Sequence, residues 1–430
     1  MATRLGERVR GLVEFDALLL TAALWFLAKF LRYAFPPLFP TFGTEFAVSN
    51  TLLGTAFTVM MTVYAAMQFP SGALADRLGA VTVVVAGAGV AAAGALALVV
   101  SLPFAALVGG MVLVGLGTGA HKTVAVRLLS RTYPAQTGRA LGVLDTFGAF
   151  GGVVAPAAVV AVTARADWHA LFLLGGLAGL LLAVAFAVSA PRRVPPPTAA
   201  SETETALRAY LRLFADGRFS AFVGVTLCFS FAYNGVVAFL PLYLTEQAGL
   251  SGTAASLLYS VLFLVSLVQL VTGDLSDRVG RLPVIGVTLG LAAVASVALV
   301  AAGADASAVG EPAVLAVDTG AVRFGVDRSL LSLGTIVVVL GLGSHGFRPV
   351  RGAYLSAVIP ESVAGGGLGV VRTLLMGAGA VAPAVVGVVS DRRGFTAAFT
   401  LLAASMTLAV LLVAVVGLLD RSTAADTGEE

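Results

Sequence analysis

Long apolar runs constrain the fold of this chain more than any other feature. There are twelve, each bounded by charged residues or by Gly/Pro-rich breaks, and only 11% of all residues are charged. A run of about 20 apolar residues can cross a hydrocarbon core of roughly 30 Å as an α-helix, and a soluble domain carries about 25% charged residues. The sequence therefore predicts an all-α integral membrane protein with twelve transmembrane helices. The predicted spans are 16–40, 50–71, 80–101, 103–130, 138–163, 168–190, 219–244, 252–273, 282–303, 329–355, 363–389 and 395–418.

A short charged motif occurs twice and indicates an internal duplication. The pattern G-x-L-x-D-R-x-G covers residues 72–79 and recurs 201 residues later over 273–280. Lys122 matches Arg348 at an offset of 226. Each half thus contains six spans, and because six is even the halves are parallel repeats about an axis along the membrane normal. The predicted domains are an N-terminal six-helix bundle (1–190), a cytoplasmic linker (191–217), a C-terminal six-helix bundle (218–418) and a polar cytoplasmic tail (419–430).

The distribution of Lys and Arg predicts the orientation of the chain. With the N-terminus inside, fifteen face the cytoplasm, five face outward and six fall within spans. Cytoplasmic loops carry the excess of Lys and Arg, so both termini are predicted to be cytoplasmic. The first span has no clear small-residue cleavage site and is interpreted as a retained helix of a multi-pass cell-membrane protein. Residues 304–328 are predicted to form a long loop.

Twelve spans in two parallel halves, with the charged motif after the second and the eighth, resemble the major facilitator superfamily of transporters. The resemblance covers about residues 16–418. It implies that the motif lies on the cytoplasmic face and that its Asp latches across to the other half when the transporter faces outward. Asp76 and Asp277 would then be the latch acids, with Arg127 or Arg131 as the partner of Asp76. The glycines of the motif would permit tight turns. The alternative to a latch is that both copies are simple solvated cytoplasmic turns. The other motif positions implied are Gly72, Arg77, Gly79, Gly273, Arg278 and Gly280.

The resemblance to the proton-driven drug exporters of this superfamily is incomplete. Their span-four Arg is replaced by Met111, and their span-five G-x-x-x-G-P motif survives only in part, with Ala155 in place of the second Gly. These departures make drug export the less favoured alternative.

Six cations fall within the predicted spans. An ionised side chain there costs at least about 2.5–3.5 kcal/mol, so each needs a partner or a water-filled cavity. The resemblance implies that spans one, four, seven and ten line a central cavity. Lys29 and Arg32 in span one share a helix face because they lie three residues apart. We predict that Lys29 and Arg32 face the central cavity. The alternative is that they pair locally or lie nearer the membrane surface. The six cations are Lys29, Arg32, Lys122, Arg348, Arg351 and Arg372.

The two halves differ in charge at one matched pair of positions. Lys122 and Asp145 both lie roughly 10 Å deep in their spans and can pair, whereas their counterparts Arg348 and Arg372 are both cations. Guanidinium groups without a carboxylate need an anion, and their planar fork suits carboxylate, nitrate or phosphate oxygens. An anionic solute is therefore the predicted substrate. The alternative is that Arg351 and Arg372 reach cytoplasmic water.

Other polar residues in the spans are candidates for coupling or solute contact. Asp145 is the only acid well inside a predicted span and is the candidate for proton coupling. His121 can titrate near neutral pH, with a packing role as the alternative. Contact with the solute is also predicted for Gln68, Gln269, Tyr33, Tyr233 and Asn234, and interhelical hydrogen bonds are the alternative for the two glutamines.

The motifs of enzymes and of metal or nucleic-acid binding proteins are missing from the sequence. Cys228 is the only cysteine, and there is no H-E-x-x-H, no nucleotide-binding loop and no basic stripe. We expect no enzymatic activity, no cofactor, no metal and no nucleic acid. The prediction is a monomeric secondary active transporter in the lipid bilayer, which moves a small anionic solute by alternating access. A proton or another ion is the candidate for coupling. The alternatives are a proton-coupled exporter of hydrophobic or cationic compounds and a non-transporting receptor with a transporter fold.

Overall fold

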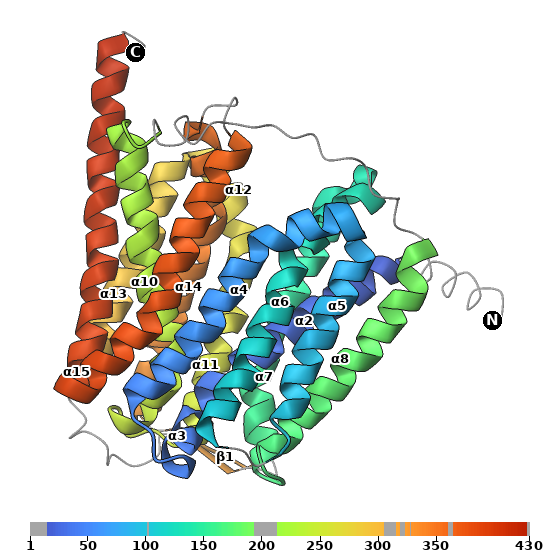
Figure 1. Cartoon of the computed structure of the whole chain (residues 1–430). Helices are drawn as coiled ribbons and strands as arrows, with labels where there is room; N and C mark the ends of the chain where they lie inside the picture. Colours follow the sequence, from blue (N-terminus) through green and yellow to red (C-terminus); the bar gives the residue numbers. More distant parts are fainter. Residues whose placement is uncertain are drawn as a thin grey trace, which may run out of the picture. The chain divides into compact units, whose positions relative to one another are not determined.

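The computed structural model (Figure 1) describes residues 15–100, 103–192, 213–304, 315–318, 323–326, 328–359 and 364–427. The first six spans are formed by α2 (Asp16–Tyr33) with α3 (Phe35–Glu45), α4 (Asn50–Leu78), α5 (Ala80–Ala97), α6 (Phe104–Thr132), α7 (Thr137–Thr163) and α8 (His169–Ser189). The second six are formed by α10 (Gly217–Glu246), α11 (Gly252–Leu264) with α12 (Gln269–Val279), α13 (Arg281–Ala304), α14 (Arg328–Val358) and α15 (Ala364–Thr427). Three short 3-10 segments are η1 (Pro134–Gln136), η2 (Ala190–Arg192) and η3 (Val265–Val268).

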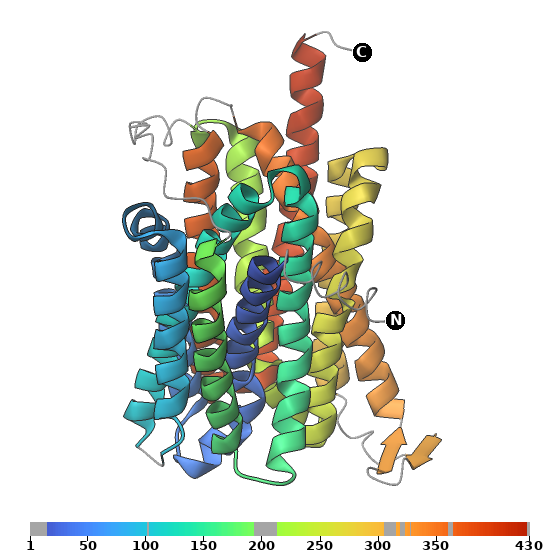
Figure 2. The same ribbon diagram turned by 90° about the vertical axis from the view of Figure 1, so that its right-hand side faces the viewer.

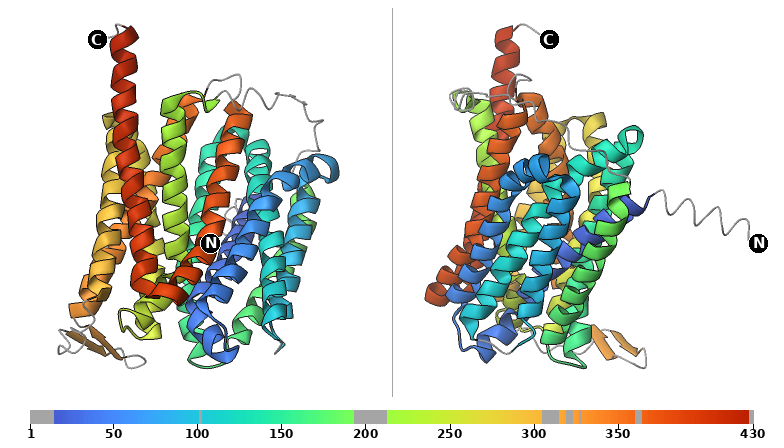
Figure 3. Two further views of the ribbon diagram at one scale, coloured as in Figure 1. Left: turned by 60° about the vertical axis from the view of Figure 1, so that its left-hand side comes forward. Right: turned by 45° about the vertical axis from the view of Figure 1, so that its right-hand side comes forward.

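Helix α15 contains the last two predicted spans. Its only non-helical residue is Gly394, with φ 81° and ψ 165°, and Figure 3 shows the sharp bend in this helix. Among the described residues, eleven helical segments are long and apolar enough to cross a membrane. Because the last of them contains this bend, it counts as two spans, and the prediction of twelve is confirmed. Beyond the bend, α15 continues to Thr427, past the predicted span end at 418.

The segment predicted as a long loop contains a short β-hairpin (Figure 2). Strand β1 (Leu315–Asp318) pairs antiparallel with β2 (Arg323–Val326), and Ala316 lies opposite Gly325. Val and Phe residues in the two strands favour extended backbone. The prediction of a loop is corrected at these residues, because an apolar-run criterion does not detect strands of four residues. Most of the predicted linker, 193–212, lies outside the described residues.

The chain divides into two compact units. The first unit comprises Met1–Leu38 and Val59–Glu202, and the second comprises Phe39–Thr58 and Thr203–Glu430. Helices α3 and α4 therefore each pass from one unit to the other along their length. The predicted N-terminal bundle differs from the first unit in including residues 39–58, and its boundary stays a prediction.

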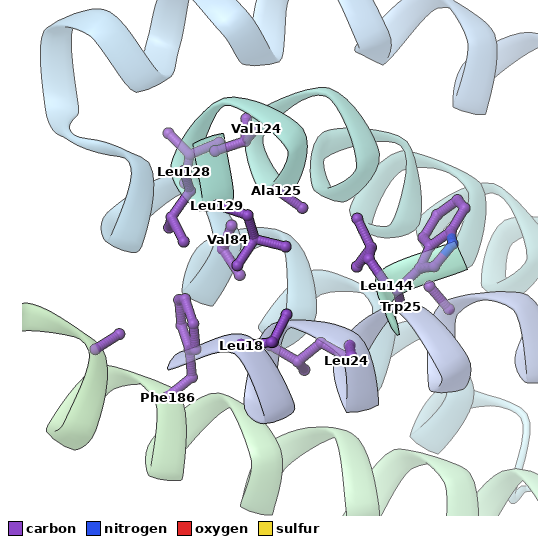
Figure 4. Close-up of a cluster of buried hydrophobic side chains, with 14 of the residues drawn as sticks. Leu18, Leu24, Trp25, Val84, Val124, Ala125, Leu128, Leu129, Leu144 and Phe186 are labelled. Atoms are coloured by element: carbon purple, nitrogen blue, oxygen red, sulfur yellow. The ribbon is translucent and has the colours of Figure 1, made fainter. Parts of the chain in front are cut away.

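The core of the first unit contains side chains from α2, α5, α6, α7 and α8 (Figure 4). Leu18 and Trp25 on α2, Val84 on α5, Leu128 on α6 and Phe186 on α8 are all at most 6% exposed. In a membrane, lipid tails are as apolar as these side chains, so close packing stabilises helix association more than apolar burial does.

Glycines allow α5 and α6 to approach closely within this unit. A Cβ atom on Gly117 would lie 2.3 Å from the carbonyl oxygen of Gly87 and 2.4 Å from the amide nitrogen of Ala91. Side chains larger than hydrogen would therefore separate the two backbones. Part of the high glycine content, 50 residues, is explained by such contacts, since small residues line helix interfaces in membranes.

The two copies of the charged motif are helical over most of their length, so α4 and α12 continue past the predicted span ends at 71 and 273. Only the last glycine of each copy leaves the helix, with φ 88° at Gly79 and φ 92° at Gly280. Such values with extended ψ are essentially restricted to glycine. Gly72 and Gly273 lie inside α4 and α12, and a Cβ on Gly273 would contact nothing within 4 Å. These two glycines are not required for a turn.

Candidate functional site

Span one is interrupted directly after two of the predicted intramembrane cations. Pro36 and Pro37 have no N–H and cannot donate to the carbonyls four residues earlier. Helix α2 accordingly ends at Tyr33 and α3 begins at Phe35. Arg32 lies in the last turn of α2, where the helix dipole favours a positive charge.

Lys29 and Arg32 share one face of α2 with Trp25, as their spacing predicts. Arg32 is 3% exposed, and its guanidinium carbon lies 3.8 Å from the ring centroid of Tyr64 and 5.5 Å from that of Trp25. The Nζ atom of Lys29 lies 5.8 Å from the Trp25 ring and 5.6 Å from the Tyr33 ring. The faces of aromatic rings attract cations, by about 2 kcal/mol or more where water is excluded. They offset part of the cost of burying these charges.

Lys122 on α6 brings a third cation to the same tryptophan. Its Nζ atom lies 5.3 Å from the Trp25 ring and forms an ion pair with Asp145 on α7, so the structure contains the predicted Lys122–Asp145 pair. The side chain of Lys122 is 17% exposed, whereas that of Asp145 is 67% exposed. We call Trp25, Lys29, Arg32, Lys122 and Asp145 the cationic cluster, since it contains three cations and one carboxylate.

Two predicted residues beside the cationic cluster make helix-to-helix contacts. The Nε2 atom of His121 lies 3.0 Å from the carbonyl oxygen of Thr21, so it carries the hydrogen and donates, and the ring stacks on Trp25. Gln68 on α4 accepts a hydrogen bond of 3.2 Å from the Thr123 hydroxyl on α6. These are the packing roles that the sequence left as alternatives.

In the second unit, Tyr233 and Arg348 lie on either side of His345. The hydroxyl of Tyr233 lies 3.4 Å from Nε2 of His345, and Nη1 of Arg348 lies 3.5 Å from Nδ1 of the same ring. Because a guanidinium group can only donate, Nδ1 accepts and Nε2 carries the hydrogen. The guanidinium carbon of Arg348 also lies 5.0 Å from the Tyr233 ring. Two predicted site residues are thus neighbours.

Two further arginines add positive charge to this part of the second unit. Arg351 lies 5.7 Å from the Phe347 ring and three residues after Arg348 on α14, so the two arginines share a helix face. Among the residues that the structure describes, neither Arg348 nor Arg351 forms an ion pair with a carboxylate. The structure therefore places Arg348 and Arg351 next to each other on α14, and the third predicted arginine, Arg372, lies on α15.

Asn234 and Gln269 have contacts that explain them structurally. The Asn234 amide donates to the Ser230 carbonyl at 2.9 Å, and a Cβ on Gly379 would lie 2.5 Å from its nitrogen, so Asn234 packs against α15. The Gln269 amide donates to the Ser266 carbonyl at 2.9 Å, next to η3. Its counterpart Gln68 bonds to another helix, so the matched glutamines have different contacts.

The first copy of the charged motif contains a bidentate ion pair. Arg127 donates from Nη2 to Oδ1 of Asp76 at 2.8 Å and from Nη1 to Oδ2 at 3.1 Å. Of the two predicted partners, Arg127 and not Arg131 contacts Asp76. The second copy lacks this arrangement, because the residue 226 positions after Arg127 is Ala353. Among the described residues, no ion pair forms at Asp277.

Removing either member of the Asp76–Arg127 pair should slow transport without unfolding the protein. The two side chains are 21% and 43% exposed, and an exposed pair contributes about 0.2–1 kcal/mol. We expect Asp76→Asn and Arg127→Gln to lower the uptake rate, and the double variant to be no slower than either single one, because they remove one interaction. Uptake rate and Tm are measured together, with Arg131→Gln as the control. Additive losses in the double variant would contradict a shared role.

Two aromatic residues of the candidate site, Trp25 and Tyr64, were not predicted from the sequence. Trp25 lies four residues before Lys29 and seven before Arg32, a spacing that places all three on one helix face and that could have identified it. Tyr64 lies on α4, and no spacing rule connects it to Arg32 on α2. Its place under the guanidinium group follows only from the packing of the two helices.

Comparisons with known proteins agree with the fold. The sequence profile of the Major Facilitator Superfamily matches residues 21–326. The chain is 26% identical over 281 residues to the probable sulfoacetate transporter SauU of Cupriavidus necator, and the match covers 60% of this chain and 63% of that protein, less than two thirds of its length. It is 24% identical over 375 residues to the hexuronate transporter of Bacillus subtilis, covering 84% and 85% of the two chains.

Solved structures of transporters share the architecture. The bacterial homologue of the human lysosomal transporter Spinster, in its inward-facing and occupied conformation, superposes with a TM-score of 0.72 at 15% identity over 94% of this chain and 96% of its own. A POT family transporter in complex with 5-aminolevulinic acid gives a TM-score of 0.74 at 14% identity over 94% and 96%. At these identities the likeness shows the fold alone. Together with a profile that matches more than half of the chain, it identifies a multi-pass membrane transporter and not an enzyme. The chain belongs to the Major Facilitator Superfamily.

Proposed function

We propose that this chain is a secondary active transporter that moves a small anionic solute across the cell membrane by alternating access. The cationic cluster is the observation that carries the proposal: Lys29, Arg32 and Lys122 all lie within 5.8 Å of the Trp25 ring in the first unit, and Lys122 also pairs with Asp145. An excess of positive charge inside a membrane is costly unless an anion or water compensates it. Two relatives are named as transporters of sulfoacetate and hexuronate, which are both anions.

Arg32 is the proposed principal anion-binding residue. Its planar fork can bind two oxygens of one carboxylate, sulfonate or phosphate group, and the Tyr64 ring holds the guanidinium plane at 3.8 Å. Lys29 and Lys122 would add charge as point donors. Arg348 and Arg372 are proposed as anion-binding residues of the second unit.

The distribution of basic residues supports an orientation with both termini in the cytoplasm. Fifteen Lys and Arg residues fall on the side of the N-terminus and five on the other side, and the excess marks the cytoplasmic side. In this orientation the Gly79 turn faces the cytoplasm. We propose a monomer as the working unit.

Thermal stabilisation of the purified protein tests the proposal directly. A ligand that binds only the folded state stabilises it by about 2.7 kcal/mol at a concentration of 100 Kd. We expect carboxylates, sulfonates or sugar acids to raise Tm, and neutral sugars and amines to leave it unchanged. Arg32→Gln should abolish the shift. Stabilisation by cationic or hydrophobic compounds instead would favour the exporter alternative.

We further propose that Asp145 couples transport to protons. Asp145 is the ion-pair partner of Lys122, so an anionic group of the solute would compete with it for the same ammonium group. In this proposal the Asp145 carboxylate released from Lys122 carries the coupled proton. Binding of one negative charge by Lys122 would then accompany binding of one proton by Asp145.

Asp145→Asn should separate proton coupling from solute movement. The amide imitates the protonated acid, so we expect uptake driven by a pH gradient to fall at least about tenfold, while exchange of internal for external solute stays within about threefold of wild type. Both are measured in proteoliposomes, with Asp167→Asn as the control because Asp167 lies in the connection between α7 and α8. Intact pH-driven uptake in Asp145→Asn would exclude this role.

A further inference from the structure

A third copy of the charged motif lies in α15. Residues 387–394 have Gly387, Asp391, Arg392 and Gly394 at the spacing G-x-x-x-D-R-x-G, with Val389 where the other copies have Leu. The copies share a backbone conformation as well as a pattern. Their last glycines have φ of 88°, 92° and 81° and ψ of 145°, 152° and 165° in chain order. Because this region of φ and ψ is essentially open only to glycine, the three segments contain the same turn.

The third copy lies at the other end of the second unit from the second copy. Gly280 lines the same depression as Asp420. Gly394 precedes Asp420 by 26 residues of helix, which is about 39 Å at 1.5 Å per residue. The third copy is therefore not related to the others by the internal duplication. The residues that its aspartate binds are also different.

Asp391 in this copy binds the beginning of α4. Its carboxylate accepts hydrogen bonds from the backbone N–H of Asn50 at 3.1 Å and of Thr51 at 2.7 Å. The first N–H groups of a helix have no partner within the helix, and its N-terminus attracts negative charge. Asp391 thus caps α4 although it lies 340 residues away in the chain. Asp76 instead binds an arginine side chain.

Two glycines and a threonine continue this contact along the next two turns of α4. A Cβ on Gly54 would lie 2.2 Å from the carbonyl oxygen of Pro383, and a Cβ on Gly387 would lie 2.3 Å from that of Asn50. The Thr58 hydroxyl accepts a hydrogen bond of 2.9 Å from the Ala384 N–H. We call the packing of residues 50–58 on residues 383–391 the α4–α15 contact.

The α4–α15 contact ends where α4 passes from one compact unit to the other. Residues 50–58 belong to the second unit, and α4 belongs to the first unit from Val59 onward. Backbone-to-backbone contacts through glycine, with a polar cap at the end, can form and separate without rearranging large side chains. The Asp391 side chain is exposed, so water can replace its hydrogen bonds on opening.

We propose that Asp391 is a latch at the end of α4 opposite to Gly79, which holds residues 50–58 on α15 and releases them once in each transport cycle. The statement that the latch opens once per transport cycle rests on the proposed transport function. The contact itself and its release can be measured without a solute. The same eight-residue motif would then serve at both ends of α4. At one end its Asp binds an arginine, and at the other end its Asp binds a helix terminus.

Distances between spin labels on α4 and α15 test the latch. Labels are placed at Leu52→Cys and Leu401→Cys, which are 47% and 38% exposed, in a chain whose single cysteine is removed by Cys228→Ser. The distance distribution is recorded by pulsed electron resonance without solute. We expect Asp391→Ala to raise the ratio of a longer distance to the closed distance about three- to tenfold, the size expected for a charge at a helix terminus. Gly54→Ala, which places a methyl group against Pro383, should change the ratio in the same direction.

A matched control removes a cap of the same kind from another helix. Asp216 accepts hydrogen bonds from the backbone N–H of Arg218 and Phe219 at the start of α10, so Asp216→Ala should leave the distribution unchanged. An unchanged distribution in both Asp391→Ala and Gly54→Ala would overturn the latch. Since no solute is present, that result would leave the proposed anion transport standing, and failure of anion binding would likewise leave the latch standing.

Discussion

Replacing Arg32 by Gln is expected to lower uptake of the anionic solute by about 30- to 1,000-fold, corresponding to about 2–4 kcal/mol for a buried charge-assisted contact. The loss should be large because Arg32 is 3% exposed, so water screens its charge poorly, and because Gln cannot offer a cationic fork. The measurement is the initial rate of uptake into proteoliposomes.

Two variants separate the charge of Arg32 from its shape. Arg32→Lys keeps the charge but loses the planar group that lies on the Tyr64 ring, so we expect an intermediate loss. Arg165→Gln is the control, since this exposed guanidinium lies just after α7 and donates to the Ala161 carbonyl near the end of that helix. Equal uptake by wild type and Arg32→Gln would refute the proposed role of Arg32.

Replacing Gly117 by Ala is expected to destabilise the first unit by about 3 kcal/mol or more. The new methyl group would lie 2.3 Å from one backbone atom of α5 and 2.4 Å from another, and backbone atoms cannot move aside as a flexible side chain can. The measurement is the temperature at which the detergent-solubilised protein loses its monodisperse elution.

Gly109→Ala provides the matched comparison on the same helix. A Cβ at Gly109 would contact nothing within 4 Å, and Ala favours helix over Gly by about 0.8–1 kcal/mol. We therefore expect Gly109→Ala to be neutral or slightly stabilising and Gly117→Ala to be strongly destabilising. Similar effects at both positions would contradict the close packing of α5 on α6.

The architecture could be predicted from the sequence because membrane burial leaves a long and unambiguous signal. A run of about 20 apolar residues has few alternatives to a spanning helix. Helix ends were predicted less well, since α4 continues to Leu78 and α6 to Thr132, beyond the apolar runs that were used to place them. Polar residues at a membrane surface can remain helical. Hydropathy therefore predicts which residues lie in the membrane, but it does not predict where the helix ends.

The candidate site was predictable only where its residues lie on one helix or at matched repeat positions. Lys29 and Arg32 follow from helical spacing, and the Lys122–Asp145 pair follows from their similar depth. The place of Tyr64 beside Arg32 depends on how α4 packs on α2, which no local pattern encodes. The motif at residues 387–394 was missed because it has Val389 in place of Leu and does not lie at a repeat offset from the other copies.

The most direct test of anion transport is counterflow in proteoliposomes that contain only this protein. Vesicles are loaded with an unlabelled carboxylate or sulfonate and diluted into a trace of the labelled compound, with neutral sugars and organic cations tested in parallel. We predict transient accumulation of labelled anions, and none in Arg32→Gln vesicles. Accumulation of cations or neutral solutes, with none of any anion tested, would contradict the proposal that this chain transports anions.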